Sequence, residues 1–213
     1  MWHFHYPPMS DEQANRHLKN ESVIILAAGS STRLGQAKQL VDVKGMPLLR
    51  KSVLVALEAS FEHIVVVLGY HADEHKKTID HLPMEAIIHD EWEKGMGSSL
   101  KKGLLHTIES RPETSAVVVM VCDQPLLTAT HLLHLRELYK NTSKPIIASR
   151  YGTILGVPAL FDRSLFPEIL NINDAEGAKA VIVQNAESVE SIHWEEGNLD
   201  IDTPEDLEIL NSL

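Results

Sequence analysis

Short apolar runs alternate with segments of helical periodicity along most of the chain. The apolar runs predict strands at 22–28, 63–68, 86–89, 116–122, 145–149, 156–161 and 189–194. Segments with helical spacing predict helices at 47–60, 72–82, 128–140, 162–170, 175–185 and 204–213. The segment 95–99 predicts a loop that leads into a further helix, ending at about residue 106.

This alternation predicts an α/β fold. Strands that are apolar on both faces are typical of a parallel sheet that helices cover on both sides. We therefore predict an open, three-layer α/β/α sandwich with a mostly parallel sheet. The length of 213 residues suits one large domain. We assign residues 21–213 to that domain and residues 1–20 to a loosely ordered N-terminal extension.

Polar landmarks follow three of the predicted strands. The loop that starts at Gly29, the turn Gly69-Tyr70-His71 and Asp123 each come directly after a buried apolar run. The carboxyl ends of parallel strands lie at one edge of a sheet, and ligands of such sheets bind there. We therefore expect these three features to lie along the same edge.

The loop after the first predicted strand has the composition of a phosphate-binding site. Between Gly29 and Lys38 it carries glycines, hydroxyl side chains and the cation Arg33. Backbone N–H groups of such a loop bind polyphosphate, and Arg33 and Lys38 would add positive charge. The alternative is an ordinary strand-to-helix turn with basic residues at the surface, since short glycine motifs often occur without a ligand.

The net charge makes these basic residues more informative. The chain carries a formal charge of −11, which argues against nonspecific binding to nucleic acid or to an anionic membrane. An anionic ligand therefore needs local positive charge or a metal ion. No apolar run approaches the ~20 residues of a membrane-spanning helix. The single cysteine, Cys122, excludes an intramolecular disulfide and suits a protein of the reducing cytoplasm.

Carboxylates at two distant positions suggest a metal site. Asp123 ends the most apolar predicted strand, where its side chain would be held at the ligand edge. Asp200 and Asp202 flank Ile201, which should point into the core. Two carboxylates suit Mg²⁺, whose octahedral shell is completed by water and substrate phosphates. The alternative for Asp123 and Asp202 is a turn or a helix cap.

Two further segments carry residues that could take part in chemistry. Cys122 has no histidine base at a recognisable spacing, so we interpret it as a buried packing residue. Gly97 and Ser98 begin a predicted helix, where their donors either hold a ribose or phosphate or only cap the helix.

In combination, these segments resemble the MobA-like nucleotidyltransferases, the cytidylyl- and guanylyltransferases of the molybdenum cofactor. The resemblance runs from about residue 22 to the end of the chain. It rests on Leu26-Ala27-Ala28-Gly29-x-Ser31-x-Arg33-x-Gly35-x-x-Lys38, Gly45-Met46-Pro47-Leu48-Leu49, Gly97-Ser98-Ser99-Leu100, Cys122-Asp123-Gln124-Pro125 and Asp200-Ile201-Asp202-Thr203-Pro204-Glu205-Asp206.

The resemblance implies a glycosyltransferase-A-like, Rossmann-like nucleotidyltransferase fold and Mg²⁺-dependent transfer of a nucleoside monophosphate to a phosphorylated acceptor. As catalytic residues, Arg33 would contact the phosphates and Lys38 would stabilise charge on the reacting α-phosphate. Asp123 and Asp202 would hold Mg²⁺, and Ser98 would lie near the sugar. The implied nucleotide-binding set is Leu26, Ala27, Ala28, Gly29, Ser30, Ser31, Arg33, Lys38, Gly69, Gly97, Ser98 and Asp123.

One residue of the first segment bears on the choice of nucleotide. Leu-Ala-Ala-Gly resembles the cytidylyl type, whereas the guanylyl type has Leu-Ala-Gly-Gly. The methyl group of Ala28 leaves less room than glycine and favours the smaller pyrimidine. The implied nucleotide is therefore CTP, and the implied acceptor is molybdopterin. The acceptor-side segments 156–158 and 173–179 depart from the family pattern, with Val157 where a polar residue is common and Lys179 where arginine is usual.

Three other functions stay open. The nearest is a nucleotidyltransferase of the same superfamily that acts on a sugar phosphate or a polyol phosphate. A nucleotide-binding accessory protein without turnover is the second, although intact Lys38, Asp123 and Asp202 weigh against it. A redox dinucleotide-binding protein is more remote, because the spacing of Gly29 and Gly35 does not fit G-x-G-x-x-G. The leading interpretation implies CTP and molybdopterin as partners, and a molybdoenzyme or its chaperone as recipient of the product.

Overall fold

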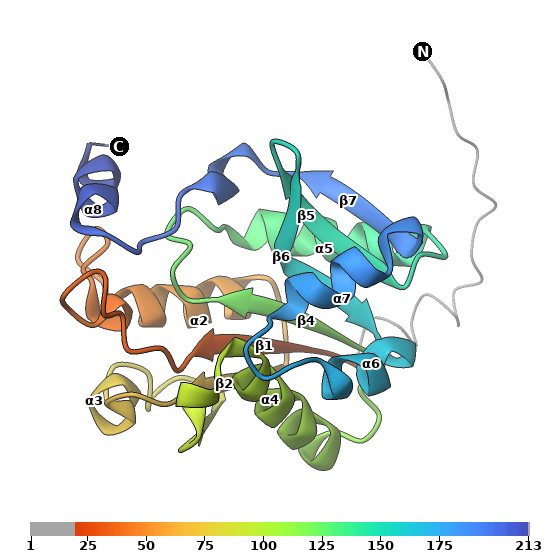
Figure 1. Ribbon diagram of the computed structural model, residues 1–213, viewed down its shortest axis with the longest axis horizontal. Coiled ribbons are helices and arrows are strands. Elements are labelled where there is room, and N and C mark those ends of the chain that lie inside the picture. The colour runs from red at the N-terminus through yellow and green to blue at the C-terminus, as the bar shows by residue number, and fades with distance from the viewer. Residues whose placement is uncertain (1–19, 213) are drawn as a thin grey trace.

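A computed structural model describes residues 20–212, in which seven strands form one sheet (Figure 1). The strands are β1 (Glu21–Ala27), β2 (His63–Leu68), β3 (Glu85–Ile88), β4 (Ala116–Val121), β5 (Ile146–Tyr151), β6 (Ile154–Asp162) and β7 (Val189–His193). The α-helices are α2 (Leu48–Glu58), α3 (Ala72–Lys76), α4 (Met96–Ser110), α5 (Ala129–Asn141), α6 (Phe166–Asn171), α7 (Ala178–Gln184) and α8 (Pro204–Asn211). Short 3₁₀ helices include η1 (Lys38–Leu40) and η2 (Trp92–Lys94). The predicted N-terminal extension lies outside the described residues, apart from Asn20.

The strand order across the sheet is β3-β2-β1-β4-β6-β5-β7. Neighbouring strands run parallel from β3 to β4 and again between β5 and β7, so the predicted mostly parallel sheet is confirmed. Strand β6 runs antiparallel to β4 and β5, which the pattern did not predict. The reason is local, because only Gly152 and Thr153 separate β5 from β6, and Gly152 has a φ of 57°. Such a short connection forms a hairpin, and a hairpin joins antiparallel strands.

Side chains of β1 alternate between two hydrophobic cores, one on each face of the sheet. Val23, Ile25 and Ala27 lie in the core that contains side chains of α2, α3 and α5. Ile24 and Leu26 lie in the core that contains side chains of α4, α6 and α7. Figure 1 shows α4 and α7 in front of the sheet and α2 and α5 behind it. The predicted three-layer α/β/α architecture is therefore confirmed.

Helix α3 is shorter than predicted. It ends at Lys76, whereas the sequence predicted a helix to residue 82. The hydroxyl group of Thr78 donates to the carbonyl group of His75 at 2.7 Å. Such local side-chain bonds compete with helical pairing, and here they accompany the turn that follows α3.

Helix α4 is longer than predicted at both ends. It begins at Met96, so most of the predicted loop 95–99 forms its first turn, and it ends at Ser110 instead of 106. The buried hydroxyl group of Thr107 donates to the carbonyl group of Gly103, one helical turn earlier, so this polar group has a partner within the helix. Within residues 20–212, no helix is long and apolar enough to cross a membrane.

A third, smaller core joins the C-terminal segment to the loop after β1. Its buried members are Leu34, Val41, Val43, Leu48, Ile201 and Leu210. Ile201 is fully buried, as the sequence predicted. Thr203 is the N-cap of α8 and forms a capping box with Asp206. This core holds Asp202 against the loop after β1.

His131, on α5, is a buried titratable residue. Its ring stacks on Trp194 with the ring centroids 4.8 Å apart. Its Nε2 atom lies 2.7 Å from the hydroxyl group of Ser149, which donates to the carbonyl group of Pro158. Burial is the main cause that lowers the pKa of His131 to about 4. The folded protein therefore favours the neutral imidazole.

Acid should destabilise the fold in part through His131. The imidazole of the unfolded chain takes up a proton near pH 6.5, whereas that of the folded protein does so only near pH 4. The free energy of unfolding should therefore fall as the pH drops from 6.5 to 4, by at most about 3 kcal/mol from this group. Urea unfolding of His131→Gln should show a smaller loss over this range. The exposed control His193→Gln should keep the wild-type loss, and an unchanged loss in His131→Gln would contradict this account.

Candidate active site

The candidate site lies at the carboxyl ends of β1 and β4, where the order in which the strands are added to the sheet reverses direction. From β1 the chain continues to β2 and β3 on one side and then returns to β4 on the other side of β1. Ligands of open α/β sheets bind outside the carboxyl ends of the strands at such a reversal. The amide of Cys122 donates to the carbonyl group of Leu26 (3.2 Å), and the amide of Tyr70 donates to that of Ala28 (3.0 Å). The three predicted landmarks therefore share one edge of the sheet.

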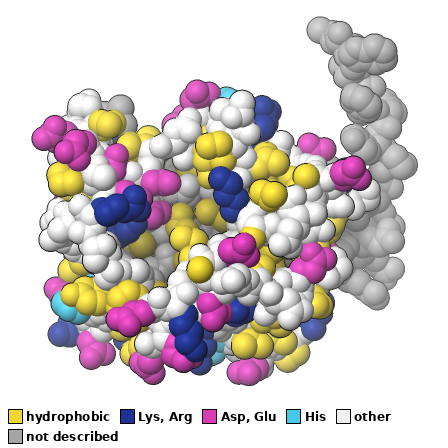
Figure 2. Space-filling view, in the orientation of Figure 1, with side chains coloured by type: hydrophobic (Ala, Val, Ile, Leu, Met, Phe, Trp, Pro, Cys, Tyr) yellow, Lys and Arg dark blue, Asp and Glu magenta, His cyan; other side chains and the backbone are white. Residues whose placement is uncertain are grey.

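A cavity of about 280 Å³ opens at this edge, and Figure 2 shows a hollow with charged side chains at its rim. Residues of the predicted set that line it are Leu26, Ala27, Ala28, Gly29, Ser30, Lys38 and Asp123. Other lining residues include Gln39, Trp92, Met96, Ser99 and Cys122. Predicted residues that do not line it are Ser31, Arg33, Gly69, Gly97, Ser98 and Asp202.

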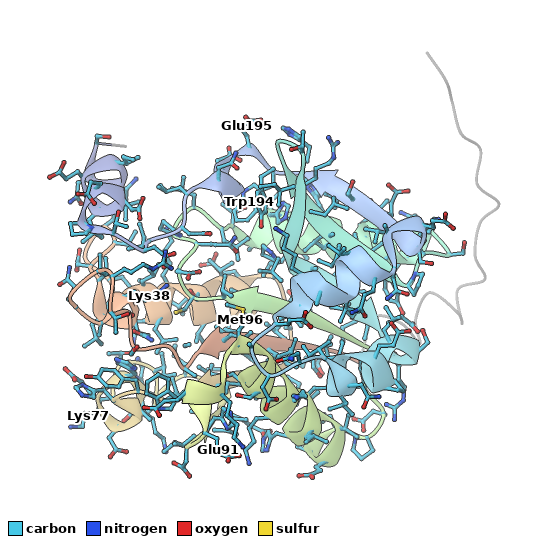
Figure 3. All side chains as sticks on the ribbon, in the orientation of Figure 1. Lys38, Lys77, Glu91, Met96, Trp194 and Glu195 are labelled. Carbon is cyan, nitrogen blue, oxygen red and sulfur yellow. The ribbon has the colours of Figure 1, made fainter. Side chains whose placement is uncertain are left out.

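Lys38 joins two carboxylates that are distant in the sequence. Its Nζ atom donates to Oδ2 of Asp123 and to Oδ1 of Asp202, each at 2.7 Å. The guanidinium group of Arg33 donates to the other oxygen of Asp202, also at 2.7 Å. Figure 3 labels Lys38 between the loop after β1 and the C-terminal segment. The two aspartates that the sequence placed together are therefore neighbours through Lys38.

Lys38 is positively charged at neutral pH. Burial alone would lower the pKa of its ammonium group, but the charge of Asp123 and the hydrogen bonds to both aspartates outweigh burial and raise that pKa. The side chain of Lys38 is 15% exposed, whereas that of Arg33 is 73% exposed. Lys38 is thus fixed inside the cluster, while Arg33 lies at the surface, where a single ion pair contributes little to stability.

The two carboxylates fit a divalent cation. Oδ1 of Asp123 is buried and has no hydrogen-bond partner, which costs free energy unless a ligand contacts it. Asp202 supplies the second carboxylate. The described part of the chain contains no group of three or more His, Cys, Asp and Glu side chains suited to a metal. A carboxylate pair alone matches Mg²⁺, which retains several waters and binds substrate phosphates.

Gln39 fixes the loop after β1, although no sequence pattern pointed to it. Its side chain is buried, and its Nε2 atom donates to the carbonyl groups of Ala27 (2.9 Å) and Gly29 (2.8 Å). The hydroxyl group of Ser31 accepts from the amide of Lys38 at 3.1 Å. These bonds hold the loop around the base of the cavity. Gln39 directly follows Lys38 in the sequence, but this neighbourhood does not indicate the direction of the glutamine side chain.

Trp92 is a second residue that the sequence did not reveal. It lines the cavity from η2 and packs edge to face against Tyr70, with the ring centroids 5.6 Å apart. A β-carbon on Gly69 would lie 2.7 Å from the side chain of Trp92 and from the carbonyl oxygen of Ala28. Gly69 therefore permits this close approach without itself lining the cavity.

The protein itself occupies the donors at the N-terminus of α4. The amides of Gly97 and Ser98 donate to the carbonyl group of Asp174, at 2.9 and 3.2 Å. The hydroxyl group of Ser98 lies 2.9 Å from Nε2 of His89. These contacts favour the structural alternative for Gly97 and Ser98, while the neighbouring Ser99 lines the cavity. A contact of Ser98 with the nucleotide sugar stays a prediction.

Cys122 is a packing residue, in line with its interpretation from the sequence. Its side chain is buried at the end of β4, and burial raises the pKa of the thiol to about 12, with a further contribution from the charge of Asp123. At neutral pH it is a protonated thiol, which is a poor nucleophile.

The fold and the loop–carboxylate arrangement are those expected of the nucleotidyltransferase superfamily. A family model described as the MobA-like NTP transferase domain matches residues 23–189. The chain belongs to this family.

The similar proteins carry names for different activities. Purine catabolism protein PucB of Bacillus subtilis is 28% identical over 203 residues, which cover 88% of this chain and 94% of PucB. Nicotine blue oxidoreductase of Paenarthrobacter nicotinovorans is 26% identical over 197 residues, covering 86% of this chain and 93% of that protein. The crystal structure of Rv0371c from Mycobacterium tuberculosis has a TM-score of 0.78 at 25% identity and covers 92% of this chain and 98% of its own. The family is thus shared, while the names point to no single substrate.

Proposed function

We propose that this protein transfers CMP from CTP to the phosphate group of molybdopterin and releases pyrophosphate. The observation that carries the proposal is the cluster of Lys38, Asp123 and Asp202 at the cavity beside the loop after β1. A fixed cation and two carboxylates meet there, next to Gly29 and Ser30 of the loop, which line the cavity. Transfer at phosphorus depends mainly on such positioning and on neutralising charge.

The chemistry proposed for these residues is a direct displacement. An oxygen of the acceptor phosphate attacks the α-phosphorus of CTP, and the bond from the α-phosphorus to the oxygen that bridges to the β-phosphate breaks. Pyrophosphate leaves with that oxygen and the bonding electron pair. Lys38 stabilises negative charge on the α-phosphate, and the raised pKa of Lys38 keeps it protonated. Arg33 contacts the phosphates from the exposed side of the cluster.

Asp123 and Asp202 would hold Mg²⁺ in this reaction. When bound, the ion supplies charge neutralisation at the phosphates and at the leaving pyrophosphate. The buried Oδ1 of Asp123, which lacks a hydrogen-bond partner, supports this role. A further structure of Rv0371c, with a TM-score of 0.73 at 24% identity, is a complex with manganese. Manganese and magnesium favour similar oxygen ligands, so a divalent cation is consistent with the shared fold.

Ala28 supports CTP as the nucleotide. Its side chain is buried in the core on the α4 side of the sheet, and the residue lines the cavity. The carbonyl group of Ala28 accepts from the amide of Tyr70, which fixes the backbone at this point. The methyl group therefore cannot shift away from a larger purine base at low cost.

Ala28→Gly should relax the preference for CTP over GTP. Removal of one methyl group from a binding pocket changes selectivity by about 10-fold or more. The measurement is the ratio of kcat/KM for CTP to that for GTP in the wild type and the variant. Ala116→Gly removes the same group from a buried side chain at the other end of β4, outside the cavity, and should keep the wild-type ratio. An unchanged ratio in Ala28→Gly removes the argument for CTP.

Pyrophosphate release tests the reaction and separates the alternatives. The protein is incubated with Mg²⁺, each of the four nucleoside triphosphates, and molybdopterin, a sugar phosphate or a polyol phosphate. We expect release only with CTP and molybdopterin. Release with a sugar or polyol phosphate instead would favour the other branch of the superfamily. No release with any pair would favour a binding protein without turnover.

A redox activity is tested in parallel because one relative is named an oxidoreductase. Oxidation of NADH or NADPH by the protein, with no pyrophosphate released in the first assay, would favour that alternative. We expect no such oxidation, since the loop after β1 lacks the dinucleotide-binding spacing.

We further propose that residues 21–213 form one functional unit and that the protein acts in the cytoplasm. The buried Ile201 and the contacts of Asp202 with Lys38 and Arg33 support this unit, because they attach the C-terminal segment to the loop after β1. The CMP adduct of molybdopterin would then pass to a molybdoenzyme or to its chaperone.

A further inference from the structure

Lys38 serves as the counter-ion of the two aspartates. Its Nζ atom contacts one oxygen of Asp123 and one oxygen of Asp202, each at 2.7 Å. Arg33 contacts the other oxygen of Asp202. The remaining oxygen, Oδ1 of Asp123, is buried and has no hydrogen-bond partner. The carboxylate pair is therefore neutralised by side chains of the chain itself.

A free cation would have to displace Lys38 from this position. The bonds from the ammonium group to the two carboxylates are charge-assisted, which makes them stronger than neutral hydrogen bonds. The side chain of Lys38 is largely buried, so solvent screens its repulsion of an incoming dication only weakly. Binding of the cation alone is thus opposed.

A nucleoside triphosphate offers Lys38 and Arg33 replacement partners. Phosphate oxygens accept charge-assisted hydrogen bonds as carboxylates do, so neither cation loses this type of bond on moving. Arg33 lies in the loop that would bind the phosphates. Lys38 directly follows this loop, at the start of η1, and lines the cavity. Lys38 and Arg33 therefore only have to exchange carboxylate oxygens for phosphate oxygens at the same edge of the sheet.

We propose that the ammonium group of Lys38 occupies the cation position between Asp123 and Asp202 in the nucleotide-free protein. A divalent cation then binds these two aspartates tightly only after a nucleoside triphosphate has bound and Lys38 has moved to its phosphate groups. The inference rests on the metal role proposed above for these two aspartates. It goes beyond that role, because it sets the order in which nucleotide and metal bind.

Titration of the nucleotide-free protein with Mn²⁺ tests this order without any turnover. The electron paramagnetic resonance signal of free Mn²⁺ reports the affinity. Lys38→Met should bind Mn²⁺ at least about 10-fold more tightly than the wild type, because only the exposed Arg33 then pairs with a carboxylate of the pair. Lys38→Arg keeps the charge and should stay close to the weak wild-type affinity.

Two further variants make the outcome decisive. In Lys38→Met/Asp123→Asn the gain in Mn²⁺ affinity should disappear, which places the ion at the pair. Lys38→Gln is the second neutral variant, and thermal unfolding shows which neutral variants are folded. Wild-type Mn²⁺ affinity in a folded neutral variant would overturn the inference, as would a gain that survives Asp123→Asn. No acceptor is present, so a failure of CMP transfer to molybdopterin would leave these results standing.

Discussion

Asp123→Asn should lower kcat/KM for nucleotidyl transfer by about 10²–10³-fold, the loss typical of removing one group that stabilises transition-state charge. Asparagine keeps the size of the side chain but removes the negative charge that would hold the cation. Because Asp123 also pairs with Lys38, the variant loses the fixed position of that residue as well. Steady-state kinetics with saturating Mg²⁺ measures the effect. Full activity of Asp123→Asn would refute the metal role of this carboxylate.

The cluster 200–202 provides a matched control for that experiment. Asp200 and Asp202 flank the buried Ile201, but the bonds from Lys38 and Arg33 go to Asp202. Asp202→Asn should therefore resemble Asp123→Asn, whereas Asp200→Asn should lose less than about 10-fold. A loss in Asp200→Asn as large as in Asp202→Asn would contradict the assignment of Asp202 as the second metal ligand.

Lys38→Met should lower kcat by about 10²–10³-fold and change the KM for CTP much less. The reason is that Lys38 is proposed to stabilise charge on the α-phosphate that increases in the transition state, so its loss affects the reaction more than ground-state binding. Steady-state kcat and KM for CTP are the measurements. A raised KM with an unchanged kcat would instead assign Lys38 to substrate binding alone.

Lys38→Arg is the matched control for charge. It keeps a cation at the same point of the loop, so it should recover part of the lost kcat, although a planar guanidinium group does not reproduce the point charge of an ammonium group. Lys38→Met should also combine slower turnover with tighter Mn²⁺ binding. Lower turnover together with higher Mn²⁺ affinity is the expected result for a residue that occupies the cation position between the two aspartates and also contacts the substrate.

The layers of the fold were predictable because their signal is local. The apolar run at 63–68 coincides with β2, and alternating helices and strands led to the three-layer sandwich. The direction of β6 was not predictable from its apolar run, since such a run does not encode orientation. The short connection at Gly152 and Thr153 carries that information, as it permits only a hairpin.

The site was predictable where it depends on strand ends. The positions of Lys38 and Asp123 at one edge follow from the loop after β1 and from the end of β4. Side-chain directions were not predictable, because Trp92 and Gln39 face the cavity or the loop only through tertiary packing. The hydrogen-bond partner of the α4 donors was not predictable for a similar reason, since the carbonyl group that accepts from them belongs to the distant Asp174.

Transfer of label from CTP to molybdopterin tests the central claim most directly. CTP labelled at the α-phosphorus is incubated with the wild-type protein, Mg²⁺ and molybdopterin, and the products are separated. We expect the label in an adduct of CMP and molybdopterin, formed in step with pyrophosphate and absent with Asp123→Asn. Label that stays in CTP, or that moves to a sugar phosphate but not to molybdopterin, would contradict the proposed function.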